Sequence, residues 1–139
     1  MLNNEIYMKF ISKRSNIGII RNAVSALIID ANPTITFLNE LKTVISEAIT
    51  NCIVHGYDNQ EDKYIEMNVI VDDEKVSCDI IDYGKGIEDI AQAREPLFST
   101  KKEEERSGLG FTIMEMFCDF FEVESKVNEG TKLHFSKKW

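Results

Sequence analysis

The chain has 139 residues, of which 43% are hydrophobic and two are prolines, so it is long enough to form a single domain, 1–139, around one sizeable core. Its formal net charge of −8 argues against a direct nucleic-acid binder, because such proteins carry a basic surface to meet phosphates. No run of about 18 apolar residues could span a bilayer, and the amino terminus has no basic region followed by an apolar run. We therefore expect a cytoplasmic protein without a membrane partner.

The first half of the chain predicts one strand and two helices. Apolar residues alternate over 4–12, which indicates a strand. A helix then begins at Ser15 or Asn16, either of which can cap it, and its apolar residues recur at helical spacing. The second helix runs over about 34–55, and Gly56 is placed to end it in the left-handed conformation.

The second half predicts two hairpins with helices between them. The runs 64–71 and 76–81 are rich in strand-forming residues and are separated by a short charged turn, which indicates a hairpin. Because this order is not alternating βαβ, the chain predicts an α+β fold with helices on one face of a single sheet. The remaining elements are a short helix over 88–94, a polar stretch over 99–107, a helix over 109–117, and strands over 121–127 and 131–136.

The three cysteines do not form a recognisable framework. Cys52, Cys78 and Cys118 are odd in number and far apart, which fits neither a set of disulfides nor zinc-ligand spacing. Apolar residues flank them, so we expect small core residues.

Two glycine-rich segments suggest a nucleotide pocket. The first, Asp82-Tyr83-Gly84-Lys85-Gly86, follows a predicted strand and pairs a carboxylate with two glycines. The second is Ser107-Gly108-Leu109-Gly110-Phe111, at the start of a predicted helix. A carboxylate can read a base edge, while glycines let backbone N–H groups approach phosphate oxygens. The first segment alone is more often an ordinary turn.

The second predicted helix carries a polar pair. Glu47 and Asn51 are four residues apart, so their side chains project from the same face. They flank the apolar stripe, so both side chains could point along the boundary between the helix and the sheet. The alternative is a surface pair with a mild helical contact; the glycine segments favour a shared pocket.

Taken in order, these motifs and Gly130-Thr131 resemble the N, G1 and G2 boxes of the GHKL ATPase superfamily, which includes gyrases and histidine kinases. Within it, the chain resembles the bacterial anti-sigma factor serine kinases, most of all their sporulation branch. The resemblance implies a two-layer α/β sandwich with a mixed, mostly antiparallel sheet and helices on one face. It covers about 5–136, and its closer part rests on 48–57, 96–101 and 105–115.

The resemblance also implies roles for the polar residues. Asn51 would help hold a Mg²⁺ that bridges the phosphates of ATP, since a carboxamide oxygen suits this cation. Glu47 would be the general base for an attacking hydroxyl. Asp82 would accept from the adenine amino group, with Thr131 supporting it directly or through a water. Gly84 and Gly86 would let the loop pass close to the base.

Other site residues surround the phosphates in this interpretation. Ser107, Gly108, Leu109 and Gly110 belong to the segment whose backbone N–H groups would meet phosphate oxygens at the start of a helix. Arg106 would neutralise charge on the terminal phosphate; its alternative is a solvated arginine paired with a nearby glutamate. His55 either borders the ribose and phosphates or makes a cap contact at the helix end.

Arg21 lies outside these motifs. The resembling kinases use an arginine at this place on the first helix to contact both the sigma factor and the anti-anti-sigma protein. The alternative is a surface arginine whose stem covers apolar neighbours. Tyr83 differs from the residue that the family usually has in the first glycine box. The glycines of the box are present, so this difference concerns partner contacts more than ATP binding.

The resemblance therefore implies an anti-sigma factor that is also an ATP- and Mg²⁺-dependent protein serine kinase and a homodimer. It would block the transcriptional activity of sigma factor F and inactivate an anti-anti-sigma factor by phosphorylating a serine. The chain also allows a general-stress anti-sigma-B-type kinase, a histidine-kinase-like catalytic domain, and a non-catalytic ATP-gated binding module. The histidine-kinase alternative lacks an obvious phosphoacceptor, because His55 and His134 lie at the pocket edge and in a strand.

Overall fold

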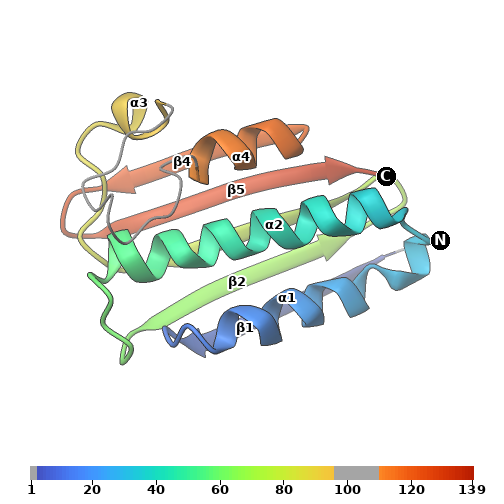
Figure 1. Cartoon of the computed structure of the whole chain (residues 1–139), viewed down its shortest axis with the longest axis horizontal. Coiled ribbons are helices and arrows are strands. Elements are labelled where there is room, and N and C mark those ends of the chain that lie inside the picture. Colours follow the sequence, from blue (N-terminus) through green and yellow to red (C-terminus); the bar gives the residue numbers. More distant parts are fainter. Residues whose placement is uncertain (1–2, 96–109) are drawn as a thin grey trace.

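The computed structural model describes residues 3–95 and 110–139 as helices packed on one face of a five-stranded sheet (Figure 1). The strand order is β1-β2-β3-β5-β4, and all four pairings are antiparallel. The sheet that was expected to be mostly antiparallel is thus antiparallel at every one of these pairings. The strands are β1 Asn4–Ile11, β2 Tyr64–Val71, β3 Lys75–Asp82, β4 Phe120–Lys126 and β5 Gly130–Lys138; the helices are α1 Asn16–Leu27, η1 Ile29–Ala31, α2 Ile35–Asn51, η2 Cys52–Gly56, α3 Ile90–Ala93 and α4 Gly110–Phe117.

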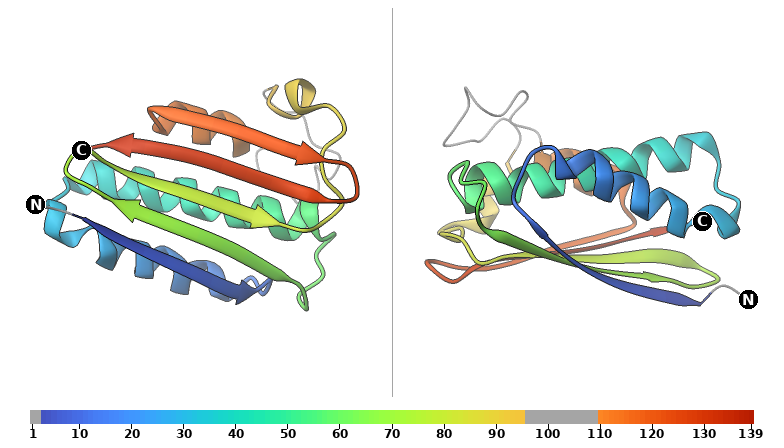
Figure 2. Two further views of the ribbon diagram at one scale, coloured as in Figure 1. Left: turned by 180° about the vertical axis from the view of Figure 1, so that it is seen from behind. Right: turned by 90° about the horizontal axis from the view of Figure 1, so that it is seen from below.

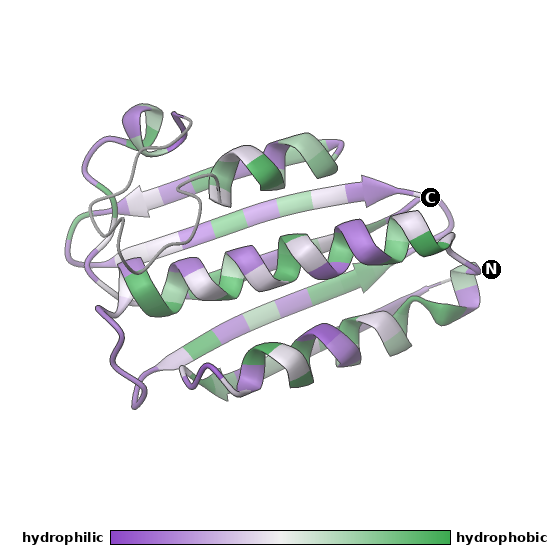
Figure 3. Ribbon diagram, in the orientation of Figure 1, coloured by the Kyte–Doolittle hydropathy of each residue, from purple (hydrophilic) through white to green (hydrophobic). Residues whose placement is uncertain are grey.

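The two layers are separate in side view, with helices on one side of the sheet and no helix of the described residues on the other (Figure 2). Alternation along the strands produces this arrangement, because successive side chains of a strand point to opposite faces. In β3, every second residue from Val76 to Asp82 is buried, while the residues between them are partly exposed. Figure 3 shows the corresponding alternation of apolar and polar residues along β2.

The core lies between the sheet and the helices. α1 contributes Ile20 and Val24, and α2 contributes a longer apolar stripe that includes Leu41, Ile45 and Ala48, all of them buried. This spacing of three and four residues is that of one helix face. The predicted α+β architecture is confirmed, and the predicted strands and long helices match the observed ones to within a few residues.

Two local predictions about helix ends are wrong. Ser15 stands at the N-cap position of α1 but makes no side-chain cap bond, because its backbone is already helical (φ −62°, ψ −20°) and a capping residue needs an extended backbone. Gly56 does not end the second helix in the left-handed conformation. Instead, α2 continues as a π-helical turn, η2, and the left-handed residues are Asp58 and Asn59.

The end of the molecule opposite η2 is closed by the last residue described, Trp139. Its indole ring lies 5.2 Å from the ring of Phe37, measured between centroids, and its Nε1–H donates to the Asp72 carbonyl oxygen at 2.9 Å. These contacts join β5 to the start of α2 and to the β2–β3 hairpin. Cys52 and Cys78 are buried and Cys118 is partly buried, all three as free thiols, in keeping with core positions. Within the part of the chain described, no helix is long and apolar enough to cross a membrane.

Candidate functional site

Apart from Arg21, the predicted site residues within the described part of the chain lie toward one end of the sheet, where β3 ends, β5 begins and α2 passes into η2 (Figure 1). Asp82 is the last residue of β3 and lies directly opposite Thr131 in β5. Residues directly opposite each other in an antiparallel pair point to the same face. Both are buried on the helix side, where η2 contacts β3 and β5. The fold therefore brings together motifs that lie far apart in the sequence.

Asp82 is the most unusual group of the site. It is 1% exposed. Its Oδ1 accepts a hydrogen bond from the Gly84 N–H at 3.0 Å, but Oδ2 is buried and receives no hydrogen bond from the described residues. Burial raises the pKa of the carboxyl to about 6, and the Gly84 N–H offsets part of that effect. A buried acceptor without a donor is costly, so Oδ2 is poised to receive a donor from a ligand.

Glycines shape the wall beside this carboxyl. A Cβ on Gly56 would lie 2.8 Å from Cγ and Oδ1 of Asp82, and a Cβ on Gly84 would lie 1.9 Å from the Gly56 carbonyl oxygen. That oxygen also accepts from the Lys85 N–H at 3.0 Å. The loop after β3 is thus pressed against η2 with no room for side chains. Gly56 and Gly84 are therefore required to be glycine by contacts within the protein, because any larger side chain would clash with neighbouring protein atoms.

Gly86 and Gly130 fasten the same loop to the hairpin of β4 and β5. Gly86 has φ +75°, and a Cβ there would lie 2.2 Å from the Lys126 carbonyl oxygen. Gly130 has φ +122°, and a Cβ there would meet the Asp82 carbonyl oxygen at 2.1 Å. Positive φ at both positions favours glycine independently of space. Gly86, the second glycine of the predicted box, is therefore the residue through which the loop packs against the end of β4.

Ser125 is a part of the site that the sequence analysis missed. Its Oγ lies 2.8 Å from Thr131 Oγ1 and 3.0 Å from the Gly130 carbonyl oxygen, and it accepts from the Ile87 N–H at 2.8 Å. The signal was available in the alternation of β4, because Ser125 shares the helix-facing side of this strand with Phe121 and Val123. A hydroxyl on an otherwise apolar inward face needs a partner.

Tyr57 is a second residue that was missed. It follows η2 and is buried, and its hydroxyl accepts from the Tyr83 N–H at 2.7 Å while donating to the Tyr64 carbonyl oxygen. Burial raises the pKa of this phenol to about 12, so it stays protonated. Tyr57 thereby ties the beginning of the loop after β3 to the end of η2.

The polar pair of the second helix lies in the last turns of α2. Glu47 and Asn51 are both partly buried, and Asn51 is the last residue before the π-helical turn that contains His55. In that turn the Tyr57 N–H donates to the Cys52 carbonyl oxygen, five residues back. π-turns are rare and are found frequently at functional sites. Glu47, Asn51 and His55 therefore lie on the helical segment that borders Asp82.

Four predicted site residues lie outside the described part of the chain: Arg106, Ser107, Gly108 and Leu109. Gly110 is described, is buried, and is the first residue of α4. Helix α4 packs against α2, so the helix that follows the second glycine box borders the helix that carries Glu47 and Asn51. This arrangement is consistent with the expected position of that box, whose own placement stays a prediction.

Arg21 does not belong to the pocket. It lies on α1, is partly buried, and its Nη1 donates to Ser46 Oγ on α2 at 3.2 Å. The Ser46 hydroxyl in turn donates to the Lys42 carbonyl oxygen at 2.9 Å. The guanidinium is thus oriented by α2, in contrast to a freely solvated surface arginine.

The chain is similar in sequence to a known protein family and to several known proteins. The model of the histidine kinase-like ATPase domain family matches residues 11–137. An anti-sigma F factor of Clostridium botulinum strain Eklund 17B is 45% identical over 139 residues, which cover 100% of this chain and 97% of the relative. The anti-sigma F factor of Anoxybacillus flavithermus is 46% identical over 136 residues (98% and 93%), and that of Clostridium perfringens strain SM101 is 44% identical over 137 residues (99% and 98%).

The chain belongs to the histidine kinase-like ATPase domain family and groups there with the anti-sigma F factors. The resemblance inferred from the glycine boxes is therefore confirmed, as is the fold expected from it. Membership of this ATPase domain family implies that the chain binds ATP.

Proposed function

We propose that this chain is an anti-sigma factor with ATP-dependent protein serine kinase activity: it binds sigma factor F and blocks transcription by it, and it phosphorylates a serine of an anti-anti-sigma factor. The observation that carries the ATP-dependent part is the buried Asp82 carboxyl, whose Oδ2 has no donor among the described residues. The names of its relatives support the sigma-factor part.

Adenine fits this place because the buried Oδ2 of Asp82 lacks a donor among the described residues and the 6-amino group of adenine supplies one. A deprotonated Asp82 would accept from the amino group, so nucleotide binding calls for the ionised form of a carboxyl whose pKa is about 6.

Mg²⁺ would be held by the Asn51 carboxamide oxygen, a hard ligand of the kind this cation prefers. When bound, Mg²⁺ supplies neutralisation of the phosphate charge. Among residues 3–95 and 110–139, no group of three or more His, Cys, Asp or Glu side chains is placed to hold a metal. Mg²⁺ commonly takes most of its ligands from phosphates and water, so a single carboxamide is a sufficient protein contribution.

Phosphoryl transfer would rest on two further residues. Glu47, one helical turn before Asn51, would accept the proton of the attacking serine hydroxyl, and Arg106 would stabilise charge on the transferred phosphoryl group. The reaction needs mainly positioning and charge neutralisation, since the transition state of phosphoryl transfer is loose.

For the partner, Arg21 is the proposed contact on α1, oriented by Ser46. We further propose that the chain acts in the cytoplasm as a homodimer, on the strength of the family resemblance.

The test is a transfer assay with labelled ATP, a serine-bearing anti-anti-sigma protein and the Glu47→Gln variant. We expect acid-stable phosphoserine on the partner with the native chain. Glu47→Gln should bind ATP normally but transfer phosphate about a hundredfold more slowly, in line with the loss of a general base. The matched control is Glu122→Gln, an exposed residue of β4, which should transfer at the native rate.

Each outcome separates the alternatives. Unchanged transfer by Glu47→Gln would remove Glu47 as the base. ATP binding without any transfer by the native chain would indicate a non-catalytic binding module. In parallel binding assays with sigma factors F and B, preference for sigma B would favour the general-stress branch. Arg21→Ala should weaken sigma binding without changing ATP affinity, whereas Ser46→Ala, which keeps the guanidinium, should weaken it less.

A further inference from the structure

The hydroxyl of Ser125 joins three segments that surround the candidate base pocket. It lies in β4 and contacts the loop after β3 through Ile87, the start of β5 through Gly130, and the buried side chain of Thr131. Each contact is between 2.8 and 3.0 Å, which is ordinary hydrogen-bond length. The question is which atom of this network donates to which.

A count of protons answers it. The Ile87 N–H can only donate, so it takes one lone pair of Ser125 Oγ. The Gly130 carbonyl oxygen can only accept, so the single Ser125 proton is directed to it; without that proton the two oxygens would repel each other at 3.0 Å. The second lone pair of Ser125 Oγ then accepts from Thr131. The Thr131 hydroxyl is therefore the donor in the 2.8 Å contact with Ser125.

This assignment leaves the Thr131 hydroxyl with lone pairs only. Thr131 lies directly opposite Asp82 in the β3–β5 register, and both side chains are buried on the helix face. Asp82 Oδ2 is also an acceptor and receives no hydrogen bond from the described residues. The two neighbouring groups at the base end of the pocket are thus both acceptors, and together they suit a ligand that presents an N–H₂ group.

We propose that Ser125 is a positioning residue which, by holding the proton of Thr131, fixes that hydroxyl as an acceptor and so gives the site its preference for a purine with an exocyclic amino group. The inference rests on the proposed ATP function and adds a residue to it. Ser125 touches no part of the nucleotide in this account and acts through Thr131.

The experiment compares the dissociation constants of ATP and of purine riboside triphosphate, which is ATP without its 6-amino group. The native chain should bind ATP more tightly, and Ser125→Ala should reduce that preference about three- to tenfold, the effect of one lost hydrogen bond. Ser125→Thr keeps the hydroxyl and should preserve the preference. Ser77→Ala, a serine of β3 on the opposite face of the sheet, is the matched control and should behave as native.

A double-mutant cycle shows whether Ser125 acts through Thr131. Thr131→Val removes the acceptor while keeping the shape, so adding Ser125→Ala to it should not reduce the preference further. If Ser125→Ala weakens both nucleotides by the same factor, the residue only stabilises the loop and the inference is overturned. Additive losses in the double variant would overturn it as well.

Failure of the underlying function gives a different result. If the native chain binds neither triphosphate, the proposed ATP site is wrong, and the Ser125 inference is overturned with it. If it binds both equally, ATP binding stands but the amino group is not recognised, which overturns the Ser125 inference together with the amino-group contact proposed for Asp82. Far-UV circular dichroism and the midpoint of thermal unfolding, measured for each variant, confirm that every binding constant comes from a folded chain.

Discussion

At the scale of single residues, Asp82 combines a stability cost with a binding role. Burial raises the pKa of its carboxyl from 3.8 to about 6, which corresponds to about 3 kcal/mol of unfavourable free energy for the charged form at neutral pH. Sites that bind ligands commonly retain such groups at the expense of stability. A carboxyl that served only the fold would be better replaced by a neutral side chain.

The first prediction concerns Asp82→Asn and pH. Between about pH 4 and pH 6 the folded chain holds a proton that the unfolded chain has released, so lowering the pH through this window stabilises the native protein. The asparagine of the variant cannot ionise and therefore lacks this response. Relative to the native chain, the variant should therefore lose about 1 kcal/mol of unfolding free energy when the pH is lowered from about 7.5 to 5.

Urea unfolding at the two pH values measures this difference. Asp62→Asn, the same substitution at an exposed aspartate, is the matched control for the exchange itself. ATP affinity provides a second readout: Asp82→Asn loses a charged acceptor and should bind ATP about tenfold or more weakly at neutral pH. A constant stability difference would show that the Asp82 carboxyl has an ordinary pKa.

Residue by residue, the parts of the site that could be identified from the sequence are those that carry a motif. Asp82, Gly84 and Thr131 stand beside predicted strand ends and could be assigned from the glycine boxes. Tyr57 could not be identified, and Ser125 could be identified only as a hydroxyl on the inward face of a predicted strand. The partners of these two side chains are set by strand register and by the path of the chain after η2, which a one-dimensional pattern does not encode. Both hydroxyls accept hydrogen bonds from backbone N–H groups of the loop that follows Asp82 and so hold that loop in place.

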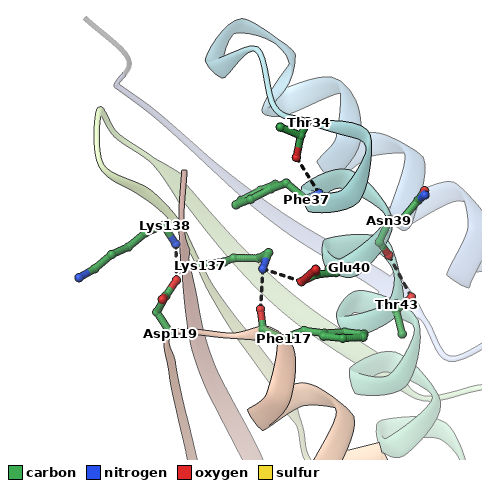
Figure 4. Close-up of polar contacts among 9 residues, drawn as sticks. All are labelled: Thr34, Phe37, Asn39, Glu40, Thr43, Phe117, Asp119, Lys137 and Lys138. Atoms are coloured by element: carbon green, nitrogen blue, oxygen red, sulfur yellow. Dashed lines mark hydrogen bonds and ion pairs between the residues drawn. The ribbon is translucent and has the colours of Figure 1, made fainter.

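At the scale of elements, the end of α4 is held by Lys137 of β5 (Figure 4). The Lys137 ammonium donates to the Phe117 carbonyl oxygen at 2.7 Å and to Glu40 Oε2 of α2 at 3.0 Å. It also lies 5.0 Å from the centroid of the Phe37 ring. A cation at the last carbonyls of a helix satisfies an acceptor and complements the helix dipole. One side chain thus connects β5, α4 and α2.

The second prediction is that Lys137→Met destabilises the chain by about 2 kcal/mol, since it leaves the Phe117 carbonyl and the partly buried Glu40 carboxylate without their common donor. Methionine keeps the aliphatic stem against Phe37, so the loss reports the ammonium. Thermal unfolding measures it. Lys138→Met is the control: Lys138 is exposed and gives its backbone N–H to Asp119, so its replacement should change stability by less than about 0.5 kcal/mol. Equal effects of the two substitutions would contradict the capping role.

The elements themselves were largely predictable, and the exception is η2. The apolar period of α2 is regular from Leu41 to Ala48, so the helix could be assigned with its buried face. Nothing in the local pattern distinguishes an α-helical from a π-helical continuation over 52–56. The wider turn is a tertiary effect, in which Gly56 is packed against the Asp82 carboxyl and the Tyr57 N–H reaches back to Cys52.

At the scale of the whole molecule, one continuous core connects the candidate site with the opposite end of the sheet. Buried residues of α1, α2, α4 and of strands β2 to β5 form a single cluster, with Phe37 and Trp139 packed against it at the far end. The site lies at the end where β3 stops, and Trp139 lies at the other (Figure 1). A single core of this extent favours cooperative unfolding of the chain as one domain, as the sequence analysis expects.

The third prediction uses Trp139, the single tryptophan of the chain, as a reporter of the end remote from the site. ATP at about a hundred times its dissociation constant should stabilise the native state by about 2.7 kcal/mol through mass action. If the chain unfolds as one unit, tryptophan fluorescence and far-UV circular dichroism should give the same transition, and ATP should shift both equally. Asp82→Asn, which should bind about tenfold more weakly, should be stabilised by about 1.4 kcal/mol at the same ATP concentration, about half of the native shift in both signals. A shift confined to circular dichroism would mean that the two ends of the sheet unfold separately, and that ligand binding at Asp82 does not stabilise the region around Trp139.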